Sequence, residues 1–139
     1  MFWSLWGEGL ASYGTGVIMG DFSIYNVMLR KEYETFAIDN RTESWLAKQF
    51  LKQYDAPLLN TEDDTQRAKW FASNSTDIRK DFPPAIGYYL GFLVVRYSID
   101  KLGYTFEELL SMKPNELKKI GEKALMELGK TNNNNVYKK

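Results

Sequence analysis

The most apolar stretch of the sequence sets the strongest constraint on the fold. Ala85–Val95 contains eleven consecutive uncharged residues and follows a pair of prolines, Pro83 and Pro84. Proline is well accommodated at the start of a helix, where its missing N–H would have no partner. The run is far shorter than the roughly 20 apolar residues that span a bilayer. We therefore expect a buried helix that starts at the prolines, ends near Gly103 and forms the centre of the core. Its apolar side chains recur at helical spacing: Ile86, Tyr89, Leu90, Leu93, Val94 and Tyr97.

The same spacing of three and four residues predicts helices along the rest of the chain. Lys31–Asp39 fits either a helix or a structured turn. No segment alternates apolar and polar residues as a half-buried strand would. The fold class predicted is therefore all-α, a bundle-like domain of about six helices. The other helices are expected over Phe2–Ile18, Ile24–Arg30, Asn40–Tyr54, a short segment after Thr61, Thr105–Met112 and Pro114–Gly129.

Residues that start and stop helices support these boundaries. Asn40–Glu43 and Thr105–Glu108 have the spacing of capping boxes. Gly20 is suited to end the first helix, and Pro57 closes the third. The polar segment Ser73–Pro84 is expected to be the longest loop. Residues 1–130 should form one helical domain, and residues 131–139, with four consecutive asparagines, a disordered tail.

Composition excludes several functions. Eighteen basic residues balance eighteen acidic ones, so no net field attracts nucleic acid or an anionic membrane, and we expect no nucleic-acid partner. The sequence has no cysteine, which excludes disulfides and thiolate metal sites. It also has no histidine, which excludes a catalytic imidazole and a histidine metal ligand. The lysines of the last helix alternate with glutamates and predict a solvated face.

Glu8 is the most informative polar residue, because it stands between Gly7 and Gly9 in an aromatic-rich helix. Glycine lowers helix stability by about 0.8–1 kcal/mol relative to alanine, so two glycines around one acid suggest a close neighbour. Glu8 could be a metal ligand, a catalytic acid or a solvated helix residue. It lies off the predicted apolar stripe of this helix, which consists of Trp3, Trp6, Leu10, Tyr13 and Val17.

Two segments carry a resemblance to a known family. Trp6–Tyr13 (WGEGLASY) resembles the glutamate helix of gluzincin-type zinc metallopeptidases. Phe82–Arg96 resembles the GYYLGY-x-V helix of a family of predicted zinc-dependent proteases, a domain of unknown function related to a gliding-motility lipoprotein family of Bacteroidetes. Gly103–Leu110 resembles the segment of that family that ends in Glu-Leu-Leu. The resemblance covers roughly Trp3–Leu128, with a generic middle third.

The resemblance assigns roles to particular residues. It implies that Glu8 is the third zinc ligand and that Ser12 supports it as a hydrogen-bond donor or caps locally. Tyr88 is the candidate donor to the oxyanion of a peptide substrate, because Tyr89 shares the apolar face with Ile86 and is expected in the core. Gly87 and Gly91 are expected to let this helix pack closely against the glutamate helix. The resemblance also implies a peptide or protein substrate and a bacterial cell-envelope or secreted location.

One departure from the family pattern limits these expectations. The HExxH motif, which supplies two histidine ligands and a general base, is absent. We therefore expect zinc only if an upstream HExxH segment is supplied, and we expect this chain alone to be inactive. The chain then resembles the C-terminal part of a longer protein, a truncated gene product or a degenerate relative.

Three functions remain open at this stage. As the C-terminal subdomain of a peptidase, the chain should place Glu8 and Tyr88 in one cleft and expose Trp3 and Trp6. As a non-catalytic interaction module, it should close its core over the Glu8 region without a further partner. The third function is binding of a sugar or a peptide in a pocket lined by the tryptophans and tyrosines.

Overall fold

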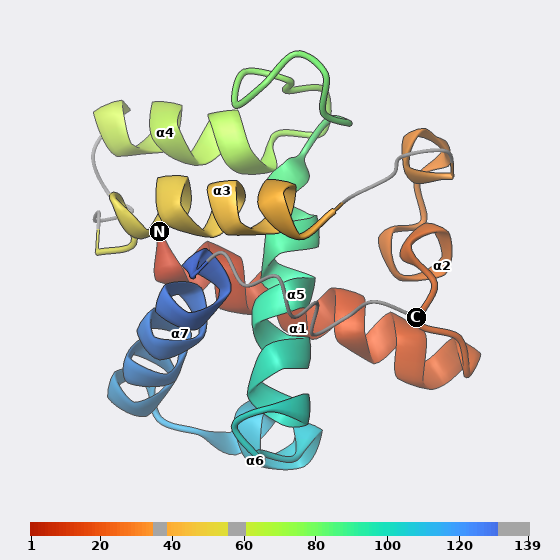
Figure 1. Cartoon of the computed structure of the whole chain (residues 1–139), viewed down its shortest axis with the longest axis vertical. Coiled ribbons are helices and arrows are strands. Elements are labelled where there is room, and N and C mark those ends of the chain that lie inside the picture. The colour runs from red at the N-terminus through yellow and green to blue at the C-terminus, as the bar shows by residue number, and fades with distance from the viewer. Residues whose placement is uncertain (35–38, 56–60, 131–139) are drawn as a thin grey trace.

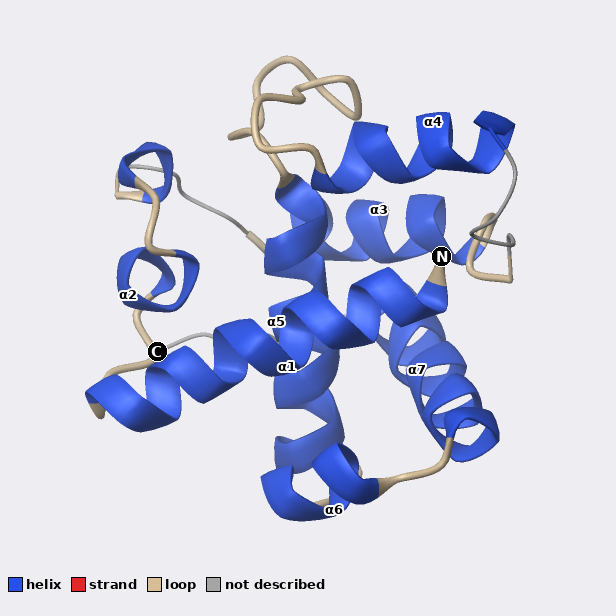
Figure 2. Cartoon of the chain, turned by 180° about the vertical axis from the view of Figure 1, so that it is seen from behind, coloured by secondary structure: helices blue, strands red, loops and turns tan. Residues whose placement is uncertain are grey.

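Helices make up every regular element of the part of the chain that the structure describes, and no strand occurs there (Figures 1 and 2). The structure is a computed structural model that describes residues 1–34, 39–55 and 61–130, with the side chains of residues 40 and 61–65 left aside. The prediction of an all-α, bundle-like domain is confirmed. The elements are α1 (Phe2–Met19), α2 (Ile24–Met28), the 3₁₀ helix η1 (Lys31–Tyr33), α3 (Asn40–Leu51), α4 (Thr61–Phe71), α5 (Ile86–Asp100), α6 (Phe106–Ser111) and α7 (Pro114–Gly129).

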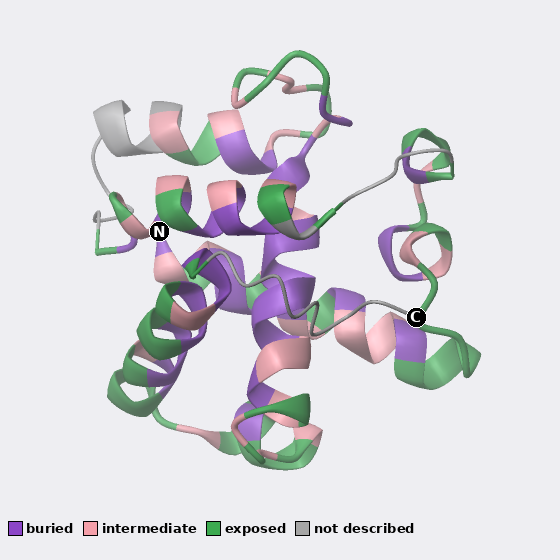
Figure 3. Ribbon diagram, in the orientation of Figure 1, coloured by how far each residue is buried: buried purple, intermediate pink, exposed green. Residues whose placement is uncertain are grey.

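The helix α5 is the centre of the core, as its apolar sequence predicts. It contacts α1, α2, α3, α4 and α7. Figure 3 shows it buried along most of its length. A helix covered on several sides needs apolar residues around its whole circumference, which explains the unbroken apolar run. The buried residues of α5 are Ile86, Gly87, Tyr89, Leu90, Gly91, Phe92, Leu93, Val94, Val95 and Ser98.

The helices α1 and α5 cross with their backbones in contact (Figures 1 and 2). A Cβ atom added at Gly9 would lie 2.3 Å from the carbonyl oxygen of Gly91, and one added at Gly91 would lie 2.6 Å from the carbonyl oxygen of Leu5. The glycines at the crossing are therefore required for this approach. Gly91 packs against the glutamate helix as expected, whereas Gly87 packs against Phe71 of α4 instead.

The predicted apolar stripe of α1 is confirmed only in part: Trp6 is buried, and Leu10 and Tyr13 pack partly buried against the core. The buried residues of α1 are Leu5, Trp6, Gly9, Ser12 and Gly16, whereas Trp3 and Val17 are exposed. A prediction from hydrophobic periodicity assumes that the largest apolar side chains of a helix face the core. The α1 backbone instead approaches α5 through small residues, which turns part of the predicted stripe outward.

The helices α3 and α7 pack against each other, and α7 also contacts α1. At the start of α1, Phe2 N donates a hydrogen bond of 3.0 Å to the carbonyl oxygen of Tyr54, which follows α3. The predicted apolar face of α7 is confirmed, and Ser44 Oγ donates a hydrogen bond to the carbonyl oxygen of Gly129 over 2.7 Å. Nearby, Trp6 Nε1 donates to Tyr54 Oη (3.3 Å), which donates to the carbonyl oxygen of Lys118 (2.9 Å). A Cβ atom at Gly121 would lie 2.1 Å from Tyr54 Oη, so this glycine makes room for the hydrogen bonds.

Several predicted helix ends are confirmed. Gly20 ends α1 with φ 65°, in the left-handed region that favours glycine. Thr105 and Glu108 form a complete capping box, with backbone-to-side-chain distances of 3.1 and 3.2 Å. Pro114 is the first residue of α7, and residues 73–84 form the loop between α4 and α5.

Other boundaries differ from the predictions. Asp39, not Asn40, caps α3 by accepting a hydrogen bond from Thr42 N at 2.8 Å. This helix ends at Leu51 rather than Tyr54, and α5 begins at Ile86, two residues after the prolines. The second helix stops at Met28 instead of Arg30, because Leu29 adopts a left-handed conformation with φ 51°. The predictions for Pro57 and for residues 131–139 lie outside the described residues.

Candidate functional site

Glu8 lies on α1 between two glycines whose surroundings differ. Gly9 faces the backbone of α5, as described above. A Cβ atom at Gly7 would have no atom of a described neighbour within 4 Å, so Gly7 borders open space. Glu8 itself is half-buried. The expected room for a neighbouring helix is confirmed at Gly9, while the surface beside Gly7 is accessible to a further group.

The helix α4 supplies a positive charge beside Glu8. Burial raises the pKa of the Glu8 carboxyl above its usual range, and the guanidinium of Arg67 partly offsets this effect. Arg67 Nε also donates a hydrogen bond of 2.9 Å to Ser4 Oγ, one helical turn before Glu8. The hydrogen bond thereby ties α4 to the side of α1 that carries the carboxylate.

Tyr88 of α5 belongs to the same group. Burial raises the pKa of the Tyr88 phenol above its ordinary value, the Glu8 carboxylate raises it further, and Arg67 and Arg30 act in the opposite direction. The ring packs edge-on against Phe71, with ring centroids 5.9 Å apart. Since a free tyrosine already titrates near pH 10, Tyr88 is a protonated hydrogen-bond donor at neutral pH.

Ser4, Glu8, Arg67 and Tyr88 are named here the Glu8 cluster. The Glu8 carboxylate lies near enough to Tyr88 to raise the pKa of its phenol, while their common cleft stays a prediction. Arg67 and Ser4 join the cluster without any indication in the sequence. The proposed supporting residue Ser12 is buried with Leu5, Gly9 and Gly16 on the inner side of α1. No side-chain hydrogen bond joins Ser12 to the Glu8 carboxylate, both of which the structure describes.

The two tryptophans near Glu8 behave differently. Trp3 is 43% exposed, as expected for a surface that lacks a partner, whereas Trp6 is only 1% exposed. The prediction that Trp6 is exposed is wrong, because its ring fills the space between α1, Tyr54 and Gly121. The core is therefore closed at Trp6 within the described residues, and of the two tryptophans only Trp3 offers accessible apolar surface.

The structure buries a second carboxylate, Glu43, which the sequence assigns to a capping box. Glu43 accepts a hydrogen bond of 3.1 Å from the Tyr89 hydroxyl, and both side chains are buried. It does not complete the predicted capping box with Asn40. The signal was present in the spacing, because Glu43 precedes the buried residues Leu46 and Phe50 by three and seven positions and therefore shares their face. Burial of Tyr89 confirms its assignment to the core.

Replacing Glu43 with glutamine should remove one component of the pH dependence of stability. Burial raises the pKa of Glu43 above its ordinary value of 4.5, against the opposing effects of the Tyr89 hydrogen bond and Arg96. Between pH 4.5 and the folded-state pKa, the folded state keeps a proton that the unfolded state releases. The free energy of unfolding of the wild type should therefore fall relative to that of E43Q as the pH rises through this window.

Urea unfolding of both proteins at pH 4, 5, 6 and 7 measures this difference. Tyr89→Phe serves as a companion variant, because loss of its hydrogen bond should raise the pKa of Glu43 further and extend the window to higher pH. A difference between wild type and E43Q that stays constant over the whole range would contradict the prediction.

The Glu8 cluster does not form a metal site by itself. Among the residues that the structure describes, no three His, Cys, Asp or Glu side chains gather closely enough to hold a metal ion. A catalytic zinc needs about three protein ligands and a water, and Glu8 supplies one. Within the same residues, no helix combines the length and the apolar character needed to cross a membrane.

Comparisons with protein-family models, with curated proteins and with solved structures found no match to this chain. A function is therefore proposed from the Glu8 cluster and from the sequence patterns alone.

Proposed function

We propose that this chain is the helical part of a zinc-peptidase-type site, in which Glu8 serves as a metal ligand and Tyr88 as a hydrogen-bond donor to the substrate. The other ligands, nitrogen donors that this sequence lacks, are supplied by an HExxH-bearing segment or chain. The observation that carries the proposal is the electrostatic effect of Glu8 on the pKa of Tyr88, two residues that come from the two segments resembling the peptidase family.

The electrostatics of Glu8 support a role beside a cation. Burial disfavours the charged carboxylate, and Arg67 only partly offsets this effect. A metal ion next to a carboxylate favours the charged form much more strongly than an exposed guanidinium. The open space beside Gly7 leaves room for the segment that would complete the site. One carboxylate does not hold zinc alone, so this chain by itself is inactive under the proposal.

The protonation state of Tyr88 supports its role as a hydrogen-bond donor to the substrate. Its phenol is held in the protonated form by burial and by the Glu8 carboxylate. A fixed donor that meets developing negative charge on a substrate oxygen stabilises the transition state more than the ground state. The packing of the ring against Phe71 restricts its orientation.

The test begins with the genomic DNA upstream of Met1, where the proposal expects an in-frame HExxH. The protein produced with that segment should hydrolyse a quenched fluorescent peptide. Tyr88→Phe should lower kcat by about 10²–10³, the usual effect of losing one oxyanion donor, without changing the zinc content. Glu122→Gln, which removes an exposed carboxylate of α7, is the matched control and should retain full activity.

Unchanged kcat in Tyr88→Phe would contradict the role of this residue. An upstream sequence without HExxH, together with no partner chain carrying it, would contradict the proposal as a whole.

The alternative function is a non-catalytic helical interaction module. The burial of Trp6 favours it, because this part of the core closes within the described residues. Under this alternative, the melting temperature of the 139-residue chain is high and is unchanged by zinc, and Glu8→Gln alters neither stability nor any metal content. A binding partner that contacts the exposed Trp3 side chain should then still bind the Glu8→Gln variant and should no longer bind the Trp3→Ala variant.

A further inference from the structure

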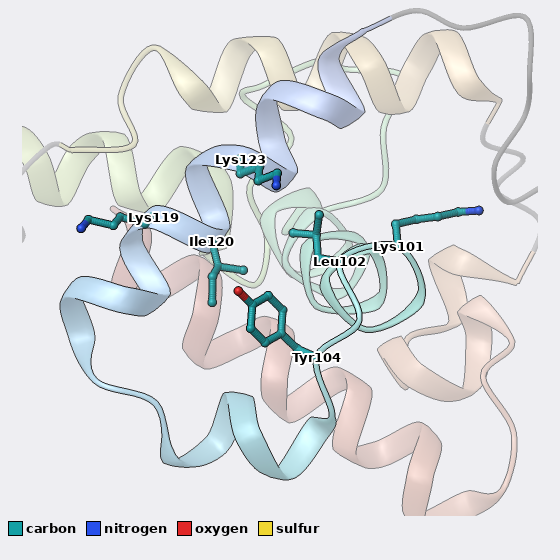
Figure 4. Close-up of a pocket in the computed structure, with 6 residues that line it drawn as sticks. All are labelled: Lys101, Leu102, Tyr104, Lys119, Ile120 and Lys123. Carbon is teal, nitrogen blue, oxygen red and sulfur yellow. The ribbon is translucent and has the colours of Figure 1, made fainter.

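A hollow of about 320 Å³ lies between the end of α5 and α7, away from the Glu8 cluster (Figure 4). Its volume is within the range of small-molecule sites. Its lining combines three apolar or aromatic side chains with three lysines: Leu102, Tyr104 and Ile120, and Lys101, Lys119 and Lys123.

The turn that ends α5 shapes the floor of the hollow. Gly103 has φ 82°, which lets the chain reverse after Leu102, and Tyr104 N then donates a hydrogen bond of 3.1 Å to the carbonyl oxygen of Ser98. The reversal places the Tyr104 ring against α7, with its hydroxyl directed toward Ile120 (Figure 4). Since this floor is fixed by backbone hydrogen bonds, the hollow is a feature of the fold.

Three lysines line the rim of the hollow, and the extended side chains of Lys101 and Lys119 point away from it in opposite directions (Figure 4). Lys119 and Lys123 lie one turn apart on α7, and Lys101 comes from the end of α5 (Figure 4). Other lysines of α7 and its end are paired, since Lys118 forms an ion pair with Asp55 and Lys130 with Glu127. Within the described residues, no carboxylate lies within 4 Å of the ammonium groups of the three rim lysines. Unlike Lys118 and Lys130, the three rim lysines therefore form no direct ion pair with a described carboxylate.

We propose that this hollow binds a small organic anion, with an apolar body on Leu102, Tyr104 and Ile120 and a carboxylate or phosphate group at the lysine rim. The apolar floor favours a ligand with an apolar part over an inorganic ion. The three exposed lysines favour an anion over a neutral molecule of the same shape, because their flexible stems allow the ammonium groups to turn toward a bound charged group. The balanced net charge gives no long-range attraction for a polyanion, which favours a small ligand over nucleic acid.

The test uses 4-phenylbutyrate as the anionic probe and 4-phenylbutyramide as its neutral analogue. Titrations followed by NMR should shift the signals of Leu102, Tyr104 and Ile120 with the anion, and the amide should bind about tenfold more weakly. Lys119→Gln combined with Lys123→Gln should weaken binding of the anion by about tenfold. Lys31→Gln combined with Lys80→Gln, which removes the same charge elsewhere on the surface, should leave the dissociation constant unchanged.

Equal binding of the acid and the amide would overturn the proposal, as would equal weakening by the two double variants. Shifts confined to residues outside the hollow would also overturn it. Glu8→Gln should bind the probe like the wild type, so the result is independent of the function proposed for the Glu8 cluster.

Discussion

Replacing Gly9 with alanine should lower the free energy of unfolding by about 3 kcal/mol, the upper end of the usual effect of overpacking a core. The added Cβ atom would lie 2.3 Å from the carbonyl oxygen of Gly91, and a backbone atom cannot move away as a flexible side chain can. The helices α1 and α5 would have to separate along their whole crossing, which is the most extensive helix contact in the described structure. Urea unfolding monitored by circular dichroism measures the change.

Gly7→Ala is the matched control for this prediction. It makes the same chemical change two residues away, where the new Cβ atom meets no described neighbour within 4 Å. Alanine in a helix interior should then raise stability by about 0.5–1 kcal/mol relative to glycine. Similar effects of the two substitutions would contradict the backbone contact between α1 and α5.

Replacing Trp6 with alanine should lower the free energy of unfolding by about 3–5 kcal/mol, as for other buried aromatic residues. The Trp6 side chain is 1% exposed, and its indole N–H donates to Tyr54 Oη. The substitution would leave a cavity between α1, α3 and α7 and would leave Tyr54 Oη without this donor.

Trp3→Ala provides the comparison, because the Trp3 side chain is 43% exposed. It should change stability by about 1 kcal/mol or less. A loss for Trp6→Ala as small as that for Trp3→Ala would contradict the closed core around Trp6.

Local chemistry explains why most of the helices could be predicted. Gly20, Pro114 and the Thr105–Glu108 capping box act within one turn of their own position, so the sequence alone reveals them. The inner face of α1 could not be predicted in this way. It depends on Gly91, more than eighty residues later, which allows Gly9 rather than a large side chain to face α5.

In the candidate site too, features set by nearby residues could be predicted and features set by distant residues could not. The choice of Tyr88 over Tyr89 followed from helical spacing, because only Tyr89 shares the inner face, and the burial of Tyr89 confirms this part of the prediction. Arg67 could not be predicted, since only the packing of α4 brings it to Ser4 and Glu8. Glu43 could have been predicted from its spacing to Leu46, but a glutamate near a helix start was assigned to capping instead.

The most direct test of the central proposal is the zinc content of the protein isolated from its native cells through a C-terminal affinity tag, with any chain that accompanies it. Inductively coupled plasma mass spectrometry should find about one zinc per chain, the stoichiometry of a single catalytic site. Glu8→Gln should reduce this content by about tenfold or more, and Glu122→Gln should leave it unchanged. Zinc-free wild-type protein, or equal zinc content in the wild type and Glu8→Gln, would contradict the assignment of Glu8 as a metal ligand.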